Sequence, residues 1–306
     1  MTTGPAVSVV VPTHNRRELL LRALRSVLRQ QGCRFEVIVV DDGCQDGTSN
    51  AIERIGDSRI RVLRNEQAIG VASARNAGVS AARSSWIALL DDDDLWSPDK
   101  LARQLAAVEN SGRAWVYAGS VEIDASGALM GGEPPLPPEE LVRELPQRNV
   151  MPAGSSNVMF RASMFHQVGR FDPRLRLMAD WDLWLRFSRA GLPACVFEPL
   201  VAYRMHGGQA TVDPKGMLAE GRLLAERHGA NLNSVRRWLA WSHLRRGERL
   251  LAARTYAETA LGGDVSSIVR AAVALFHPSP TTLRRAVPGG REWSRAAESW
   301  LQALAE

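Results

Sequence analysis

The chain has 306 residues, 45% of them hydrophobic, so it is long enough for one large α/β domain with an appendage or for two domains. Its 38 Lys and Arg against 33 Asp and Glu give a net charge of only +5, which does not indicate a nucleic-acid partner. The three cysteines are widely spaced and lack a CxxC pair, so the sequence suggests neither a disulfide framework nor a structural zinc site. The sequence shows no signal-peptide pattern and no apolar run of ~18 to 20 residues, so we expect a cytoplasmic or membrane-peripheral protein.

Apolar, β-branched runs alternate with helical patterns over the first third of the chain. The predicted strands are 6–11, 35–40, 59–63 and 86–90, and the predicted helices are 19–28, one opening at Thr48, and 71–82. This alternation predicts a doubly wound, mostly parallel sheet in a Rossmann-like α/β/α arrangement. Ligands bind beyond the carboxyl ends of the strands in such sheets, and these ends carry Thr13, Asp41, Asp42 and the aspartates 91–94.

The rest of the chain gives a weaker pattern. The Gly- and Pro-rich segment 131–138 predicts a loop or lid, with a plain linker as the alternative. Further predicted elements are strands at 157–160 and 196–204, a helix at 180–189, and helices from Gly216 onward. We expect an α/β domain over 1–212, with halves at about 1–117 and 118–212, and a helical C-terminal region over 213–306.

Basic residues gather in the helical region, between Arg222 and Arg254. A basic helical surface could contact an anionic membrane. The alternative is a solvated helical face whose arginine stems cover apolar surface.

Four consecutive aspartates, Asp91 to Asp94, follow the apolar run 86–90 directly. Clustered carboxylates repel one another, and their oxygens are preferred ligands of hard divalent cations, so the run predicts a metal site. The alternative is that Asp93 or Asp94 caps the next helix, but capping accounts for one aspartate only, and Ser97 before Pro98 is the better cap candidate.

Several familiar nucleotide and hydrolase motifs are missing. No Gly-x-Gly-x-x-Gly follows the first strand, where the loop is Pro12-Thr13-His14-Asn15-Arg16, and no Walker A lysine motif occurs. A Gly-x-Ser-x-Gly elbow is also absent. These absences disfavour nicotinamide binding, P-loop chemistry and serine hydrolysis.

The order of motifs resembles that of the inverting glycosyltransferases of family 2, which have the nucleotide-sugar-binding GT-A fold. The resemblance covers Val7 to about His206, roughly two thirds of the chain. Its five motifs are Val7 to Arg16, Val39 to Thr48, Asn65 and Gly70 with Ala74 to Gly78, the Asp-x-Asp region Leu90 to Trp96, and Gly169 to Asp172 with Ala179 to Arg186. Cys44, Gln45, Ser84 and Ala179 depart from the usual residues of these motifs.

The resemblance implies a donor site at the first strands. Thr13 and Asp42 would contact the nucleobase, and Asp41 would support that pocket. Arg75 would lie near the diphosphate, where a guanidinium fork suits phosphate oxygens. The implied nucleotide-sugar site is completed by Pro12, Asn15, Arg16, Asp91 and Asp92, with Asp91 on the ribose side.

The resemblance also implies a metal and a base. Asp93 would coordinate Mn²⁺ or Mg²⁺ directly, and His206 would lie near the metal or the diphosphate, with a surface-loop histidine as the alternative. Asp180 would be the general base, although it could instead cap its helix. Asp180 and Asp182 are two residues apart and do not share a helix face, so only one should point into the site, and which one stays open.

The function implied is a metal-dependent, inverting transfer of a sugar from a UDP- or dTDP-linked donor to a hydroxyl of a glycan, lipid-linked or small-molecule acceptor, in bacterial glycan or glycoconjugate biosynthesis. Two alternatives remain: a catalytically idle protein that binds sugar nucleotides or glycans on the same fold, and a metal-dependent nucleotidyltransferase. The loop 12–16 has no glycine, which disfavours the second alternative.

Overall fold

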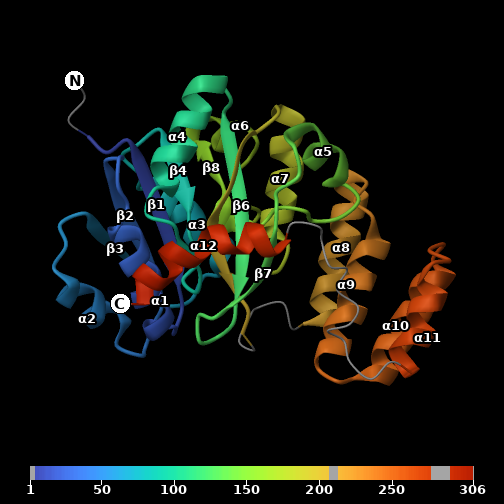
Figure 1. The fold of residues 1–306 in the computed structure, drawn as a ribbon. Helices are drawn as coiled ribbons and strands as arrows, with labels where there is room; N and C mark the ends of the chain where they lie inside the picture. Colours follow the sequence, from blue (N-terminus) through green and yellow to red (C-terminus); the bar gives the residue numbers. More distant parts are fainter. Residues whose placement is uncertain (1–3, 207–212, 277–289, 306) are drawn as a thin grey trace. The chain divides into compact units, whose positions relative to one another are not determined.

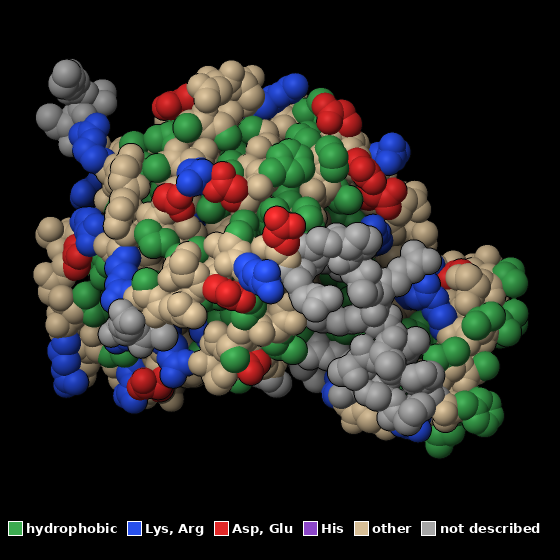
Figure 2. Space-filling view, in the orientation of Figure 1, with side chains coloured by type: hydrophobic (Ala, Val, Ile, Leu, Met, Phe, Trp, Pro, Cys, Tyr) green, Lys and Arg blue, Asp and Glu red, His purple; other side chains and the backbone are tan. Residues whose placement is uncertain are grey.

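The computed structural model describes residues 4–206, 213–276 and 290–305 (Figure 1). By contact the chain divides into two compact units, the first made of Met1–Val142, Val150–Gln209 and Gly289–Glu306, the second of Arg143–Asn149 and Ala210–Pro288. On the face seen in Figure 2, acidic and basic side chains are interspersed over the first unit.

A nine-stranded sheet forms the first unit, with the strand order β3-β2-β1-β4-β8-β6-β9-β5 and with β7 paired to β6. Strands β3, β2, β1 and β4 are parallel neighbours, β8 is antiparallel to both β4 and β6, and β6 and β9 are again parallel. The predicted α/β class with a parallel sheet is confirmed. The strands are β1 (Val7–Thr13), β2 (Phe35–Asp42), β3 (Ile60–Asn65), β4 (Trp86–Leu89), β5 (Leu95–Trp96), β6 (Trp115–Ile123), β7 (Leu129–Glu133), β8 (Met159–Arg161) and β9 (Ala194–Arg204).

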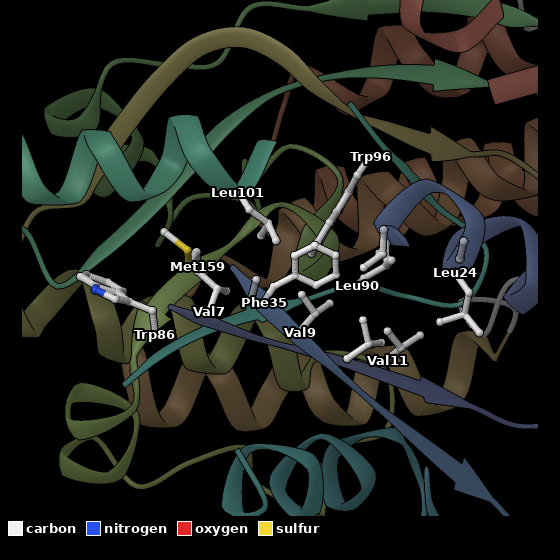
Figure 3. Close-up of a cluster of buried hydrophobic side chains, with 14 of the residues drawn as sticks. Val7, Val9, Val11, Leu24, Phe35, Trp86, Leu90, Trp96, Leu101 and Met159 are labelled. Carbon is white, nitrogen blue, oxygen red and sulfur yellow. The ribbon is translucent and has the colours of Figure 1, made fainter. Parts of the chain in front are cut away.

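Successive side chains of β1 point to opposite faces of the sheet, and different helices cover the two faces. Val7, Val9 and Val11 point to one face, where they form a buried cluster with Leu24 of α1 and Leu101 of α4 (Figure 3). Because every residue of β1 and β2 is buried, both faces of these strands are covered. The helices that contribute side chains to this cluster are α1 (Arg17–Leu28), α2 (Thr48–Ile55) and α4 (Lys100–Ser111).

Helix α3 (Val71–Ser80) covers the opposite face, against Val10 and Val40. Gly78 makes this close approach possible, because a Cβ atom there would lie 2.3 Å from Cγ1 of Val10. The tight packing holds α3, which carries Arg75, against β1 and β2.

The prediction of a loop or lid over 131–138 is wrong for its first part, since Leu129–Glu133 is strand β7, antiparallel to β6. An added Cβ atom at Gly132 would lie 2.9 Å from the Ser120 carbonyl oxygen. This glycine therefore allows β7 to lie close to β6 and does not form a turn. The Pro-rich stretch 134–137 then leads into α5 (Pro138–Glu144), which starts with a proline at the position where helices accept one.

Helix α12 (Gly290–Ala305) crosses the sheet of the first unit, in front of β6 and β7 in Figure 1. Its Ala297 and Trp300 share a buried cluster with β6 and β9, and Trp293 Nε1 donates a hydrogen bond to the Ser120 carbonyl oxygen at 3.0 Å. Gly119 makes room for the Trp293 ring, because a Cβ atom there would lie 2.1 Å from it. The last helix therefore belongs by contact to the sheet, although its sequence resembles that of the helices before it.

The second unit is helical in its described part, as the apolar spacing after Gly216 predicts. Asp213 caps its first helix by accepting a hydrogen bond from the Lys215 amide at 3.1 Å, with Pro214 at the first helical position. No helix within 4–206, 213–276 and 290–305 is long and apolar enough to cross a membrane. The helices of this unit are α8 (Pro214–His228), α9 (Leu232–Arg245), α10 (Arg249–Leu261) and α11 (Ser267–Phe276).

Candidate active site

The carboxyl ends of β1 and β4 bring Thr13 and Asp92 together. The two strands are parallel neighbours, so the residues that follow them meet at the same edge of the sheet. The Thr13 hydroxyl donates a hydrogen bond to Asp92 Oδ2 at 2.7 Å, and both side chains are buried. Pro12 is buried within β1, where it keeps the chain extended up to Thr13.

Arg16 bridges two members of the aspartate run. Its Nη1 atom lies 3.2 Å from Asp92 Oδ1 and 2.9 Å from Asp93 Oδ2. Burial raises the pKa of Asp92 to about 6, and the neighbouring charge of Asp93 adds to this shift, while Arg16 and Thr13 act against it. Asp92 and Asp93 thus lie close enough for their charges to repel each other, and Arg16 pairs with both.

Asp42, at the end of β2, organises the chain that enters α3. One carboxylate oxygen accepts hydrogen bonds from Asn65 Nδ2 at 2.8 Å and from the Ile69 amide at 2.9 Å, and the other accepts one from the Gly70 amide at 2.9 Å. These bonds hold the connection between β3 and α3 against the end of β2.

Asp41 is fully buried beside the loop that follows β1. It accepts hydrogen bonds from the Cys44 amide at 2.8 Å and from the Ser49 hydroxyl. Cys44 in turn accepts one from the Asn15 amide, with a nitrogen-to-sulfur distance of 3.1 Å. Asn15 has a φ of 52°, a left-handed conformation that asparagine tolerates well. These hydrogen bonds therefore link the loop after β1 to the loop after β2.

The last aspartate of the run, Asp94, is fully buried and braces the site. Its carboxyl group accepts hydrogen bonds from the Ser156 hydroxyl at 2.5 Å and from the Arg204 amide at 2.9 Å. Burial, together with the charges of Asp93 and Asp91, raises the pKa of Asp94 well above its ordinary value. The Ser156 hydroxyl also accepts a hydrogen bond from the Asp91 amide at 3.0 Å, so it joins both ends of the run.

The helix-cap interpretation of this run is wrong. Helix α4 begins at Lys100, with Asp99 at the N-cap position and no side-chain capping bond, so neither Asp93 nor Asp94 caps it. Ser97, which we expected to cap the helix, instead donates its hydroxyl hydrogen bond to Asp99. The aspartate run thus has no role in starting α4.

Asp93 and His206 lie side by side, although 113 positions separate them in the sequence. His206 Nε2 is 2.9 Å from Asp93 Oδ2, and the two side chains are only 13% and 11% exposed. Strand β9 carries His206 to this position, and the buried Arg204 side chain donates from Nε to the Asp93 carbonyl oxygen at 2.9 Å. The surface-loop alternative for His206 is wrong, since the ring is largely enclosed.

Arg75 projects from α3 and forms an ion pair with Asp91. Its guanidinium carbon lies 5.3 Å from the centre of the Phe171 ring, a cation–π arrangement. The side chain is buried, yet within the described ranges 4–206, 213–276 and 290–305 its Nε–H group has no hydrogen-bond partner. An unused buried donor costs free energy, which suits a group that receives an acceptor oxygen from a ligand.

Asp180 and Asp182 have separate surroundings on α7 (Ala179–Ala190). Asp182 is buried and forms an ion pair with Arg186, one turn further along the helix. Burial raises the pKa of Asp180, the positive charge of Arg75 lowers it, and the negative charge of Asp91 raises it further, so Asp180 lies within the field of these two residues. The N-cap interpretation of Asp180 is wrong, because Met178 occupies that position.

Asp93 and His206 fit a divalent metal whose remaining coordination positions would be filled by a bound phosphate ligand and water. Asp93 and His206 offer a carboxylate oxygen and an imidazole nitrogen within 2.9 Å of each other, and the charge of Asp93 also acts on Asp92 and Asp94. Across the described part of the chain, no group of three or more His, Cys, Asp and Glu side chains forms a metal site. Mg²⁺ sites of phosphate-handling enzymes commonly use only one or two protein carboxylates and complete the shell with phosphate oxygens and water.

Sequence reasoning missed Ser156 and Arg204, which hold the site in place, and it considered Asp94 only as part of the metal-binding run or as a helix cap. Ser156 lies in the short 3₁₀ helix Gly154–Asn157, within a segment where the pattern indicated no element before 157. Arg204 lies at the end of β9, two positions before His206, and only that proximity could have drawn attention to it.

The chain is similar in sequence to a known protein family and to several of its members. The family model "Glycosyl transferase family 2" matches residues 8–169, just over half of the chain. The succinoglycan biosynthesis protein ExoO of Rhizobium meliloti is 34% identical over 218 residues, 66% of this chain and 61% of that protein. The UDP-Glc:alpha-D-GlcNAc-diphosphoundecaprenol beta-1,3-glucosyltransferase WfgD of Escherichia coli is 34% identical over 125 residues, 41% of this chain and 49% of that protein. The chain thus spans about half to three fifths of these two relatives.

Among solved structures, S. aureus TarS 1-349 in complex with UDP-GlcNAc has a TM-score of 0.59 at 16% identity, over 97% of this chain and 81% of that one. This likeness confirms the GT-A architecture expected from the sequence. The family model and the architecture agree, and the chain is therefore a member of glycosyltransferase family 2.

Proposed function

We propose that this protein is an inverting, metal-dependent glycosyltransferase that moves a sugar from a nucleoside-diphosphate donor to a hydroxyl acceptor. The observation that carries the proposal is the meeting of Arg75, Asp91 and Asp180 next to the enclosed Asp93 and His206 pair. Such an arrangement offers cationic and carboxylate groups for a leaving diphosphate and a separate carboxylate for an acceptor hydroxyl. The named relatives favour a role in bacterial polysaccharide or glycoconjugate biosynthesis.

The donor is inferred to be a UDP-sugar, with a dTDP-sugar as the alternative. WfgD is named for a UDP-Glc donor, and TarS is described in complex with UDP-GlcNAc. In this chain Thr13 and Asp42 end the strands at the edge where the base would lie, with Asp41, Asn15 and Pro12 shaping the loops around them.

The leaving diphosphate would be received by Arg75, whose buried Nε–H has no hydrogen-bond partner among the residues that the structure describes. A guanidinium can form paired hydrogen bonds to phosphate oxygens, and its charge favours the departing anion. Arg16 would assist from the opposite side of the aspartate run. Asp93 and His206 would hold Mn²⁺ or Mg²⁺, which would supply Lewis-acid neutralisation of the negative charge that develops on the leaving diphosphate.

The acceptor hydroxyl would give its proton to Asp180. A single carboxylate on the far side of the anomeric carbon suffices for direct displacement with inversion. Burial raises the pKa of Asp180, which makes its carboxylate a stronger base, while the positive charge of Arg75 acts against this rise. Asp182 is committed to Arg186 and is not proposed as the base.

The acceptor is inferred to be a lipid-linked sugar, with a free glycan or a small molecule as alternatives. WfgD is named for a GlcNAc-diphosphoundecaprenol acceptor. The family model ends at residue 169, before α7 and the proposed base Asp180, so it does not bear on the choice of acceptor.

Nucleotide release in the presence of an acceptor tests this function. The protein is incubated with Mn²⁺, with UDP-glucose, UDP-GlcNAc or a dTDP-sugar, and with a short polyprenyl-diphosphate-linked GlcNAc. We expect nucleoside diphosphate to be released together with transfer of the labelled sugar. Nucleotide binding without release would favour the idle sugar-nucleotide-binding alternative, and release of pyrophosphate from a nucleoside triphosphate would favour a nucleotidyltransferase.

A further inference from the structure

Helix α11 carries an apolar stripe on its solvent-facing side. The stripe consists of residues at positions i, i+1, i+4, i+7 and i+8, which occupy one face of a helix with 3.6 residues per turn. Its large side chains are 40 to 83% exposed. The members are Ile268, Val269, Ala272, Leu275 and Phe276.

The opposite side of α11 already has its packing partners. Ala274 is buried in a cluster with Ala240, Leu244, Ala252 and Tyr256, and Ala271 packs against the same cluster. The apolar stripe is therefore additional to the face that the fold of this unit uses. A helix that is apolar on both sides calls for a second apolar partner, because exposed apolar patches are unfavourable in water.

The neighbouring helix extends the exposed apolar surface. On α10, Leu250 is 80% and Leu261 is 90% exposed, with Ala257 on the same helix face. Val265, in the turn that joins the two helices, is 70% exposed. Figure 2 shows hydrophobic side chains projecting over α10 and α11.

The sequence of the second unit, to which this surface belongs, is basic. The second unit has fourteen Lys and Arg against seven Asp and Glu, a net charge of +7, whereas the whole chain has +5. The rest of the chain therefore has a net charge of −2, by difference. Arg254, one turn along α10 from Leu250, has a 77% exposed side chain and pairs with Glu258, whereas Arg270 of α11 lies toward Tyr256 of the buried cluster.

This combination favours an anionic bilayer over a second copy of the chain. Two such units would bring like charges together at the contact, which opposes association. An anionic membrane instead attracts the arginines, whose long stems allow the head groups to stay at the phosphate level while apolar side chains enter the interface.

We propose that α10 and α11 form a membrane-docking surface, which lies on an anionic bilayer and inserts the apolar stripe at the level of the head groups. The surface attaches the protein and does not cross the bilayer. The inference does not rest on the proposed function, because attachment requires neither the donor site nor turnover.

Vesicle sedimentation of the full chain tests the proposal. We expect binding to phosphatidylcholine vesicles that contain phosphatidylglycerol, little binding to phosphatidylcholine alone, and weaker binding as salt rises. The double substitution Ile268→Glu with Phe276→Glu should weaken binding by about tenfold or more, since it removes apolar insertion and adds negative charge. Phe197→Glu, at a 54% exposed aromatic of β9 in the first unit, is the matched control and should bind as the wild type does.

Three results would overturn the proposal. They are no binding to anionic vesicles at low salt, binding that the double substitution leaves unchanged, and a stable dimer in solution that the double substitution dissociates while vesicles bind neither protein. Circular dichroism and UDP binding of the double variant show whether its fold and donor site are intact, which separates a failure of docking from a failure of the proposed function.

Discussion

Asp180 and Asp182 lie two residues apart on α7, but Asp182 is buried in an ion pair with Arg186, whereas Asp180 lies in the field of Arg75 and Asp91. The two substitutions to asparagine should therefore have different effects. Asp180→Asn should lower kcat by about 10²- to 10⁴-fold with little change in UDP affinity, because it removes a general base. Steady-state kinetics and UDP titration measure the two quantities.

The matched control is Asp182→Asn, which should lower the free energy of unfolding more than it lowers kcat, because it leaves the buried end of Arg186 without its charge partner. If Asp182→Asn abolished transfer in a folded protein while Asp180→Asn remained active, the assignment of the base would be reversed.

The charges around Asp180 predict opposite pH shifts for two substitutions. A general base must be ionised, so activity falls on the acid side as its pKa is approached. Arg75→Met removes a charge that lowers the pKa of Asp180, so the acid limb of the kcat/KM profile should move to higher pH. Asp91→Asn removes a charge that raises this pKa, so the limb should move to lower pH.

The position of the limb is the measured quantity, because both substitutions also reduce the rate near the diphosphate. Arg75→Lys keeps the positive charge and should leave the limb close to that of the wild type. A shift of both neutralising variants in the same direction would contradict the electrostatic argument.

Lys100 predicts a pH dependence of stability. It is fully buried, it donates to Gln104 Oε1 at 2.8 Å, its Nζ lies 3.8 Å from the Trp96 ring centre, and burial lowers its pKa well below 10.5. The unfolded chain then binds the proton more tightly than the native protein, so this residue makes stability rise with pH below 10.5, by up to about 1.4 kcal/mol per pH unit.

Denaturant unfolding at pH 7, 8 and 9 tests this, with Lys100→Met as the comparison. As pH rises, the free energy of unfolding of the wild type should increase relative to that of the variant. A constant difference across this range would mean that Lys100 is protonated equally in both states.

Gly119 and Trp293 should be energetically coupled. Gly119→Ala places a methyl group against the Trp293 ring and 2.8 Å from the Glu198 carbonyl oxygen, so it should lower the free energy of unfolding by about 1–3 kcal/mol. In the double variant with Trp293→Ala the ring clash is gone, so the combined loss should be smaller than the sum of the two single losses. Additive losses would show that α12 does not rest on β6 through this contact.

The first three strands with their helices, and strand β4, follow from the sequence because each is a strongly periodic segment between clear turn residues. Strand β7 could not be predicted, because Gly131 and Gly132 are typical turn residues and only the structure shows that they pack closely against β6. The packing of α12 on the sheet was equally hidden, because amphipathic spacing shows that a helix has an apolar face but does not name its partner.

In the site, too, local sequence patterns predict some features, whereas contacts between residues distant in the sequence are not predicted. Thr13, Asp41, Asp42 and Asp93 follow strands and could be found from their positions alone. The bracing of Asp94 by Ser156 joins residues 62 positions apart, and no local pattern reports such a contact. The separation of Asp180 from Asp182 likewise depends on Arg186, which a helix with several charged residues does not single out.

The most direct measurement is calorimetric titration of UDP, with and without Mn²⁺, into the wild type, Asp93→Ala and Asp57→Ala. Asp57 pairs with Arg59 before β3 and serves as the matched control. We predict that Mn²⁺ strengthens UDP binding to the wild type and to Asp57→Ala, and that Asp93→Ala, in a folded protein, loses this gain. No binding of UDP or dTDP under any condition, or a metal effect that Asp93→Ala leaves unchanged, would contradict the assignment of this site.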